Sequence, residues 1–184
     1  MKLVHFLYED AEMHGCGVNK DDDILAARSL GWLECARYLH SRGCRFSLLT
    51  NYVAAHNGNL EALKFLNEIG VAIRMETVQC AVLNGKVDCA RYLLDRYSEP
   101  VTRDFVHNIL VTAAMAGCLQ CLEIGWNKFE PVRHLQDEWT VLLQAALYGR
   151  PSILEFGRTN QFAAFQLPEH AATMVRLVVH GGHV

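Results

Sequence analysis

The sequence contains no apolar run of about 18 residues, the length that a membrane-spanning helix needs. The apolar segment at residues 1–8 is also too short for the hydrophobic region of a secretory signal. Nor does the chain have the composition of a disordered protein, because 51% of its 184 residues are hydrophobic and 20% are charged. We therefore expect a folded intracellular protein, cytoplasmic or nuclear, that makes no membrane contact.

An excess of positive charge is absent as well. The chain has 17 lysines and arginines against 20 aspartates and glutamates, a net charge of −3, and its basic residues are dispersed. Since nucleic-acid phosphates require a basic face, nucleic acid is not expected as the main partner. The sequence also has no Gly-x-Ser-x-Gly, no Gly-Lys-Ser/Thr nucleotide loop and no paired-carboxylate constellation typical of catalysis. These absences predict a protein that is not an enzyme and carries no cofactor.

A repeated pattern is what the sequence does contain. Gly31, Gly58 and Gly85 follow one another at intervals of 27 residues. Each has an alanine four positions before it, an aliphatic residue two positions after it and an acid three positions after it. A basic residue, an aromatic residue and a leucine then follow in the same order in all three segments. Equal steps with matched positions indicate a repeat protein.

Each repeat is predicted to form a helix, a glycine turn and a second helix. Glycine just past a helix end adopts the left-handed conformation at little cost, and an acid is favourable in the first turn of the next helix. In the second helix, Leu60, Leu63 and Leu66 form one apolar stripe at helical spacing. A single pair of short helices cannot bury such a stripe, so neighbouring pairs have to stack on one another.

The second half of the chain keeps this pattern at a longer period. Gly117 lies 32 residues after Gly85, Gly149 lies 32 residues after Gly117, and both retain the alanine four positions before them. The added residues contain Glu-Pro-Val at 99–101 and at 130–132. Because proline ends the preceding helix, these segments predict longer, extended connections.

The last repeat departs furthest from the pattern. Pro151 and Gly157 occupy positions that hold leucine in the first full repeat, and residues 157–160 are predicted to form a turn. A final helix, apolar on more than one face, is predicted over 168–180. A single domain over 1–184 is thus expected, with a half-repeat at 1–18, repeats at about 19–46, 47–73, 74–100, 101–131 and 132–160, and a terminal half-repeat at 161–184.

The frame Ala-Ala-x-x-Gly-x-Leu-Glu, with a glycine closing the second helix, resembles the ankyrin repeat in its divergent form. The Thr-Pro-Leu-His opening is absent, and the 27-residue period is shorter than the ankyrin period of about 33 by the length of the β-hairpin fingers. The resemblance implies an all-α, ankyrin-like helix-turn-helix solenoid with short or absent fingers, which leaves room for hairpin-like loops only before Val101 and Val132. It extends over 24–93, less closely over 111–122 and 143–156, and over a single helix at 171–181.

The resemblance also implies where a partner would bind. Ankyrin-repeat proteins are protein-binding scaffolds without catalysis, and residues one and two positions before each turn glycine belong to their exposed surface. This stripe becomes apolar toward the C-terminus, and exposed apolar stripes usually mark partner sites, unless the longer loops fold over them. The predicted partner-binding residues are His56, Asn57, Leu83, Asn84, Met115, Leu147 and Tyr148.

Cys118 and Cys121 form a Cys-x-x-Cys, a spacing found in zinc sites and in redox disulfides. Cys121 falls in the same repeat position as Cys35 and Cys89, which predicts a small buried helix residue. No second Cys-x-x-Cys and no histidine at ligand spacing accompany the pair, so a structural role is favoured over metal binding and over redox chemistry. The odd count of seven cysteines also argues against a disulfide framework.

Two functional interpretations follow from the repeat. The first is a protein–protein interaction scaffold. The alternative is a structural subunit of a larger multiprotein assembly, whose open ends are covered by neighbours and whose apolar helix over 168–180 mediates self-association or assembly. Trp32, Trp126 and Trp139 lie outside the matched positions, where tryptophan is either an interface anchor or a cover for a loop.

Overall fold

The computed structural model describes residues 32–41, 46–130, 134–166, 172–173 and 176. All regular structure in these residues is helical, which confirms the all-α class. The elements are α3 (Trp32–Ser41), α4 (Leu48–Asn57), α5 (Leu60–Glu68), α6 (Met75–Leu83), α7 (Val87–Arg96), α8 (Arg103–Ala116), α9 (Leu119–Lys128), α10 (Leu135–Leu147), α11 (Pro151–Thr159) and the 3-10 helix η2 (Ala163–Gln166). The predicted half-repeat at 1–18 and most of the helix predicted over 168–180 lie outside the described residues.

Tight glycine turns join α4 to α5, α6 to α7, α8 to α9 and α10 to α11. The turn glycines Gly58, Gly85, Gly117 and Gly149 have φ between 61° and 75°, the left-handed region that other residues adopt at a cost. In all four turns, the residue after the glycine donates its backbone N–H to the carbonyl of the alanine that lies four positions before the glycine, at 2.8–3.1 Å. This hydrogen bond closes the first helix and turns the chain back into the second.

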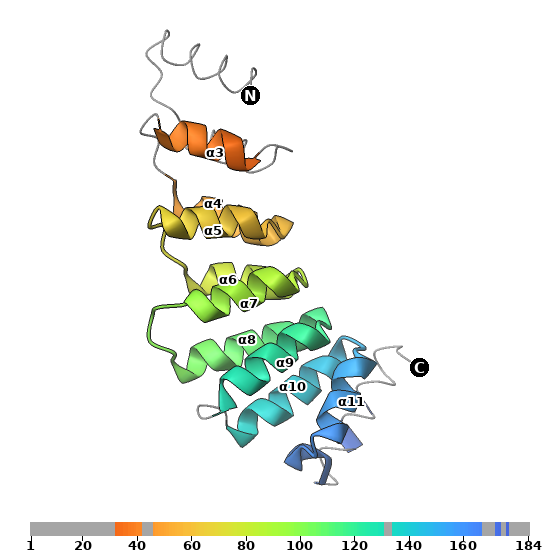
Figure 1. Ribbon diagram of the computed structural model, residues 1–184. Coiled ribbons are helices and arrows are strands. Elements are labelled where there is room, and N and C mark those ends of the chain that lie inside the picture. The colour runs from red at the N-terminus through yellow and green to blue at the C-terminus, as the bar shows by residue number, and fades with distance from the viewer. Residues whose placement is uncertain (1–31, 42–45, 131–133, 167–171, 174–175, 177–184) are drawn as a thin grey trace.

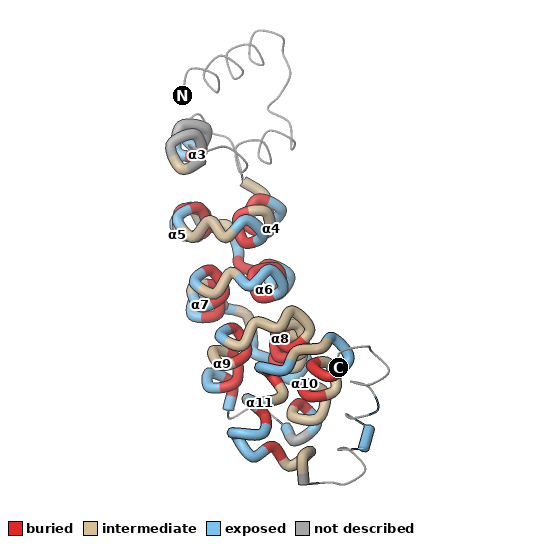
Figure 2. The backbone as a smooth tube through the Cα atoms, turned by 90° about the vertical axis from the view of Figure 1, so that its right-hand side faces the viewer, coloured by how far each residue is buried: buried red, intermediate tan, exposed pale blue. Residues whose placement is uncertain are grey.

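The helix pairs stack into two layers (Figures 1 and 2). The first helices of the pairs contact one another in the order α4, α6, α8 and α10. The second helices do the same in the order α3, α5, α7, α9 and α11. Figure 2, which is turned by 90° from Figure 1, shows the two layers as two rows of helices side by side. Such stacking is compatible with a helical-repeat protein.

Small side chains allow the two layers to approach closely. The alanine four positions before each turn glycine is at most 1% exposed in all four turns. The second helices contribute the larger core residues: Leu63 and Leu66 of α5 are 1% and 0% exposed, and Leu93 of α7 is 0% exposed. Buried apolar surface of this kind is the main favourable term in holding short helices together.

The connection between α7 and α8 carries no strand, so a hairpin finger is absent at 97–102. Side-chain contacts hold this loop instead. The Tyr97 ring stacks on the Phe105 ring with centroids 4.3 Å apart, and Arg74 pairs with Glu99 at 2.6 Å. The second expected hairpin position, before Val132, lies partly outside the described residues.

The prediction of a turn over 157–160 is wrong, because α11 continues to Thr159. Gly157 is buried inside this helix, where it allows α11 to approach α10 closely. A Cβ at position 157 would lie 2.5 Å from Leu142 Cδ2 and 3.2 Å from ring carbons of Phe162 and Phe165. The glycine therefore serves packing between helices rather than chain reversal.

Trp126 is a core residue and not an interface anchor, which excludes one of the two interpretations of that tryptophan. Its side chain is 5% exposed and stacks on the Phe162 ring with centroids 4.4 Å apart. Phe156 contacts both rings edge-on. This aromatic cluster packs α9 against α11 and against Phe162, which follows α11. Trp139 is half-buried, and the Trp32 side chain lies outside the described set.

Candidate partner-binding surface

The seven predicted partner-binding residues all lie at the C-terminal ends of the first helices or just past them, next to the glycine turns. Because the first helices stack in register, these ends gather along one side of the molecule, opposite the longer connections (Figure 1). The predicted residues are therefore brought together in space as a row that runs from α4 to α10.

Most of this row is exposed, and its largest exposed members are apolar. Leu83 is 54% exposed, Tyr148 47% and Leu147 43%. The polar residues His56, Asn57 and Asn84 are exposed as well, whereas Met115 is half-buried. The longer loops therefore leave the ends of α6 and α10 open.

Two of the seven residues also have structural roles. The Asn84 side chain donates a hydrogen bond from Nδ2 to the Cys80 carbonyl at 2.8 Å, so it caps the end of α6. The Met115 carbonyl accepts a hydrogen bond from Arg150 Nε at 3.0 Å, which ties the end of α8 to the next turn. The amide of Asn84 and the backbone of Met115 are thus already used within the protein, and the apolar side chains remain as the main contact groups.

Sequence reasoning missed three exposed apolar residues on α4. Leu48, Leu49 and Tyr52 are 46%, 48% and 43% exposed, and helical spacing places them on the same face as His56. Hydropathy alone places leucines inside and asparagine outside, yet Asn51 of the same helix is 1% exposed.

Asn51 is buried because its side chain has partners there. Its Nδ2 donates to the Ala72 carbonyl at 3.0 Å, in the connection between α5 and α6. The repeat offered a signal for this inversion, since Asn51 lies 27 positions before Val78, which is 0% exposed. Comparing repeat positions would therefore have predicted which face of α4 points outward.

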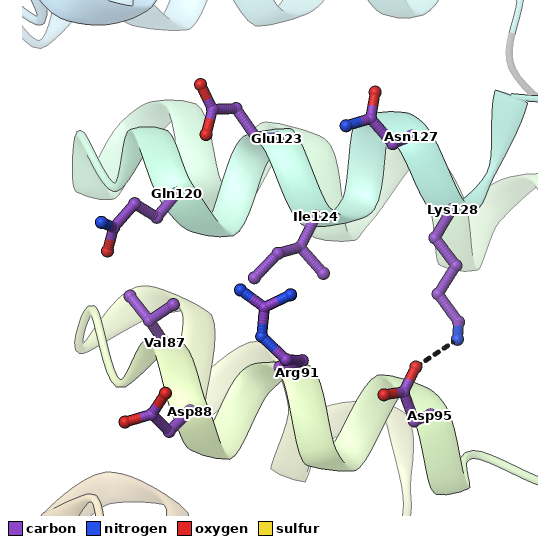
Figure 3. A pocket seen from close by; sticks show the side chains of 9 residues that line it. All are labelled: Val87, Asp88, Arg91, Asp95, Gln120, Glu123, Ile124, Asn127 and Lys128. Atoms are coloured by element: carbon purple, nitrogen blue, oxygen red, sulfur yellow. Dashed lines mark hydrogen bonds and ion pairs between the residues drawn. The ribbon is translucent and has the colours of Figure 1, made fainter.

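A shallow groove of about 800 Å³ lies on the other layer, between α7 and α9 (Figure 3). Val87 and Ile124 form its apolar part, and Arg91 projects from α7 toward α9. An ion pair between Lys128 and Asp95, 2.7 Å long, bridges the two helices at one end. This mixture of apolar and oppositely charged groups suits contact with a polar surface, and no sequence pattern had indicated it.

Cys118 and Cys121 lie at the N-terminus of α9. Cys118 is the N-cap residue, and its sulfur accepts a hydrogen bond from the Cys121 backbone N–H at 3.4 Å. Cys121 is 1% exposed, as its repeat position predicts. Within the described ranges, no group of three or more His, Cys, Asp or Glu residues is placed to hold a metal ion, so the pair has no further ligands there.

The two thiols affect each other strongly. A hydrogen bond from the Cys121 thiol lowers the pKa of Cys118 from 9.0 to about 6, burial opposes this shift, and the Cys121 backbone N–H adds to it. The same side-chain hydrogen bond raises the pKa of Cys121, and burial raises it further. The shifts therefore favour the thiolate form at Cys118 and the protonated form at Cys121.

Comparison with protein-family models, with curated proteins and with solved structures gave no match. Among the helices that the structure describes, none has the length and apolar character needed to cross a bilayer. The arrangement of exposed and buried groups therefore carries the functional argument.

Proposed function

We propose that this protein is a non-enzymatic protein–protein interaction scaffold, built as an ankyrin-like solenoid, which binds a protein partner through the exposed ends of its first helices. The observation that carries the proposal is the exposure of Leu83, Leu147 and Tyr148 by 43–54% on one side of the stack. Large apolar side chains gathered on one face are a common feature of partner sites.

The ankyrin-like part of the proposal is supported by the helix pairs themselves. Each pair has a left-handed glycine between its helices and a buried alanine four positions earlier, and the pairs stack in two layers. The connection at 97–102 carries no strand although it lies in a 32-residue interval, which supports a solenoid with short or absent fingers. With few fingers to contribute, the helix ends become the main contact surface.

The composition of the row suits a protein partner. Fully burying a leucine is worth about 1.5–3 kcal/mol, and tyrosine is frequent among residues that dominate interface energies. His56 and Asn57 provide exposed polar groups at the edge of the row, which matches the polar rim of typical interfaces. A partner with an apolar ridge and hydrogen-bonding flanks fits this surface.

Affinity capture with a charged variant tests the proposal. The Leu83→Lys substitution places a cation at the C-terminal end of α6, where the helix dipole favours it, so the fold should be retained. The control is Asn127→Lys, which adds the same charge at an exposed position of α9 in the other layer. The amount of each protein captured by the wild type is compared with the amount captured by each variant. The binding of each captured protein to the purified wild type and variants is then titrated.

The expected result is a partner whose affinity falls at least tenfold with Leu83→Lys and stays unchanged with Asn127→Lys. Equal binding to all three chains would overturn the assignment of this surface. Light scattering of the purified wild type separates the alternative role: an oligomer that Leu83→Lys dissociates would show that the row joins copies of the chain, as in a structural subunit.

A further inference from the structure

The cysteine pair at the start of α9 has the geometry of a dithiol that can close into a disulfide. Cys118 is half-buried and caps the helix, while Cys121 is 1% exposed and lies one turn further on. Both are free thiols, and the Cys121 backbone N–H donates a hydrogen bond to the Cys118 sulfur at 3.4 Å. Residues three apart in a helical turn lie on one face, close enough for the separation of about 4.4–6.8 Å between Cα atoms that a disulfide requires.

The neighbouring turns show why the Cys118 sulfur can be reached. Arg150 follows the turn glycine Gly149, and its side chain lies over Gly117, the glycine of the preceding turn. A Cβ at Gly117 would lie 2.7 Å from Arg150 Cδ. Lys86 does the same one turn earlier in the stack. In the turn between these two, the residue after the glycine is Cys118. A Cβ at Gly85, the glycine of the turn before it, would meet no atom within 4 Å. The short cysteine side chain therefore leaves open space beside it.

We propose that Cys118 and Cys121 form a redox-active dithiol that reduces low-molecular-weight disulfides, with Cys118 as the nucleophile and Cys121 as the resolving cysteine. The N-terminus of α9 supports this role, because its free backbone N–H groups and dipole stabilise an anionic sulfur. The resolving Cys121 is buried whereas Cys118 is half-buried, so the reagent reaches Cys118 first. This activity does not depend on the proposed partner binding.

The reaction proceeds in two thiol–disulfide exchanges. In the first, the Cys118 thiolate attacks one sulfur of the disulfide RSSR, the S–S bond breaks and RS⁻ leaves. In the second, Cys121 gives its proton to that departing thiolate and attacks the Cys118 sulfur, which releases the second RS⁻. Two electrons pass from the protein sulfurs to the two sulfurs of RSSR. The protein disulfide, one RSH and one RS⁻ are the products.

Exposure to oxidised glutathione at pH 7, followed by alkylation and peptide mapping by mass spectrometry, tests the proposal. The wild type should form a disulfide between Cys118 and Cys121. The Cys121→Ser variant should instead accumulate a glutathione adduct on Cys118, because no second thiol resolves it. In the Cys118→Ser variant, Cys121 should remain reduced.

The substitution Cys118→Ser retains the helix cap, since serine is a favoured N-cap residue, and an unchanged far-ultraviolet circular dichroism spectrum verifies the fold. Cys80 and Cys89, which are 3% and 2% exposed, serve as internal references in every sample. Cys118 should react at least tenfold faster than either reference. Reaction of Cys118 at the rate of Cys89, or a Cys121→Ser variant without an adduct, would overturn the proposal.

Discussion

Asp137 Oδ1 lies 2.8 Å from His107 Nδ1, across the contact between α10 and α8. The Asp137 side chain is 1% exposed, whereas that of His107 is 37% exposed. The other carboxylate oxygen of Asp137 accepts the His134 backbone N–H at 2.8 Å, which caps α10. A buried carboxylate is costly unless it is paired, so this interaction fixes how two successive first helices lie against each other.

The substitution His107→Ala should destabilise the protein by about 1–3 kcal/mol, because it removes a partner from a buried acceptor. Urea unfolding followed by circular dichroism measures the change. The matched control is His56→Ala, which removes an exposed histidine from another first helix and should change the free energy of unfolding by less than about 0.5 kcal/mol. Equal effects of the two substitutions would show that the buried carboxylate does not need His107.

Substitutions of the turn glycines separate the cost of a left-handed backbone from the cost of crowding by a neighbouring side chain. Gly85→Ala should cost about 1–2 kcal/mol, because its φ of 63° is left-handed but space for a Cβ is free. Gly117→Ala should cost more, because the new Cβ also displaces Arg150 and disturbs its hydrogen bond to the Met115 carbonyl. Thermal unfolding of both variants measures the difference.

A double-mutant cycle identifies the source of the additional cost at Gly117. In an Arg150→Ala background, the Gly117→Ala substitution should lower the stability by only about as much as Gly85→Ala does. If the excess persists in that background, the crowding by Arg150 is not its cause.

Gly157→Ala should destabilise the protein by about 1–3 kcal/mol through overpacking, although alanine normally favours a helix over glycine. The physical reason is the 2.5 Å separation that a Cβ would have from Leu142 Cδ2. Differential scanning calorimetry measures the loss. In a Leu142→Ala background, Gly157→Ala should cost less than it does in the wild type, because the crowded methyl group is gone. A single variant more stable than the wild type would contradict the close approach of α11 to α10.

The stability of the wild type should rise between pH 6 and pH 8 relative to Cys118→Ser. The pKa of Cys118 is about 6 in the folded protein against 9.0 ordinarily. A lowered folded pKa gives a contribution to stability that is fully present above the ordinary value and is lost as the pH falls through about 6. Melting temperatures of both proteins, measured at half-unit pH steps, should diverge over this window. Parallel curves would show that no thiolate is stabilised.

Above pH 9 the stability of the protein should change with pH in the opposite direction, because of Cys121. The pKa of Cys121 is raised, so the folded protein keeps a proton that the unfolded chain gives up. The gain in stability should therefore level off and then decline at alkaline pH. The Cys121→Ser variant, which cannot lose this proton, provides the comparison.

The glycine turns were predictable from the sequence because their requirements are local. The left-handed φ of Gly58 and the hydrogen bond from Asn59 to Ala54 involve residues within one short segment, so their repetition is visible as a period. The exposure of Leu83, by contrast, was expected from the resemblance to ankyrin repeats. Helix pairs and their all-α class follow from the period itself. Nothing beyond neighbouring residues was needed to infer them.

The sequence by itself determined the order of helices and turns, since helix ends, caps and glycine turns depend on residues a few positions apart. Only the tertiary structure decided that Gly157 continues a helix, that Trp126 is covered by Phe162, and that the Ala72 carbonyl is the partner of the buried Asn51. Each of these outcomes depends on a side chain or carbonyl brought close by the stacking of helices. Burial is a property of that packing, and hydropathy along the chain does not specify it.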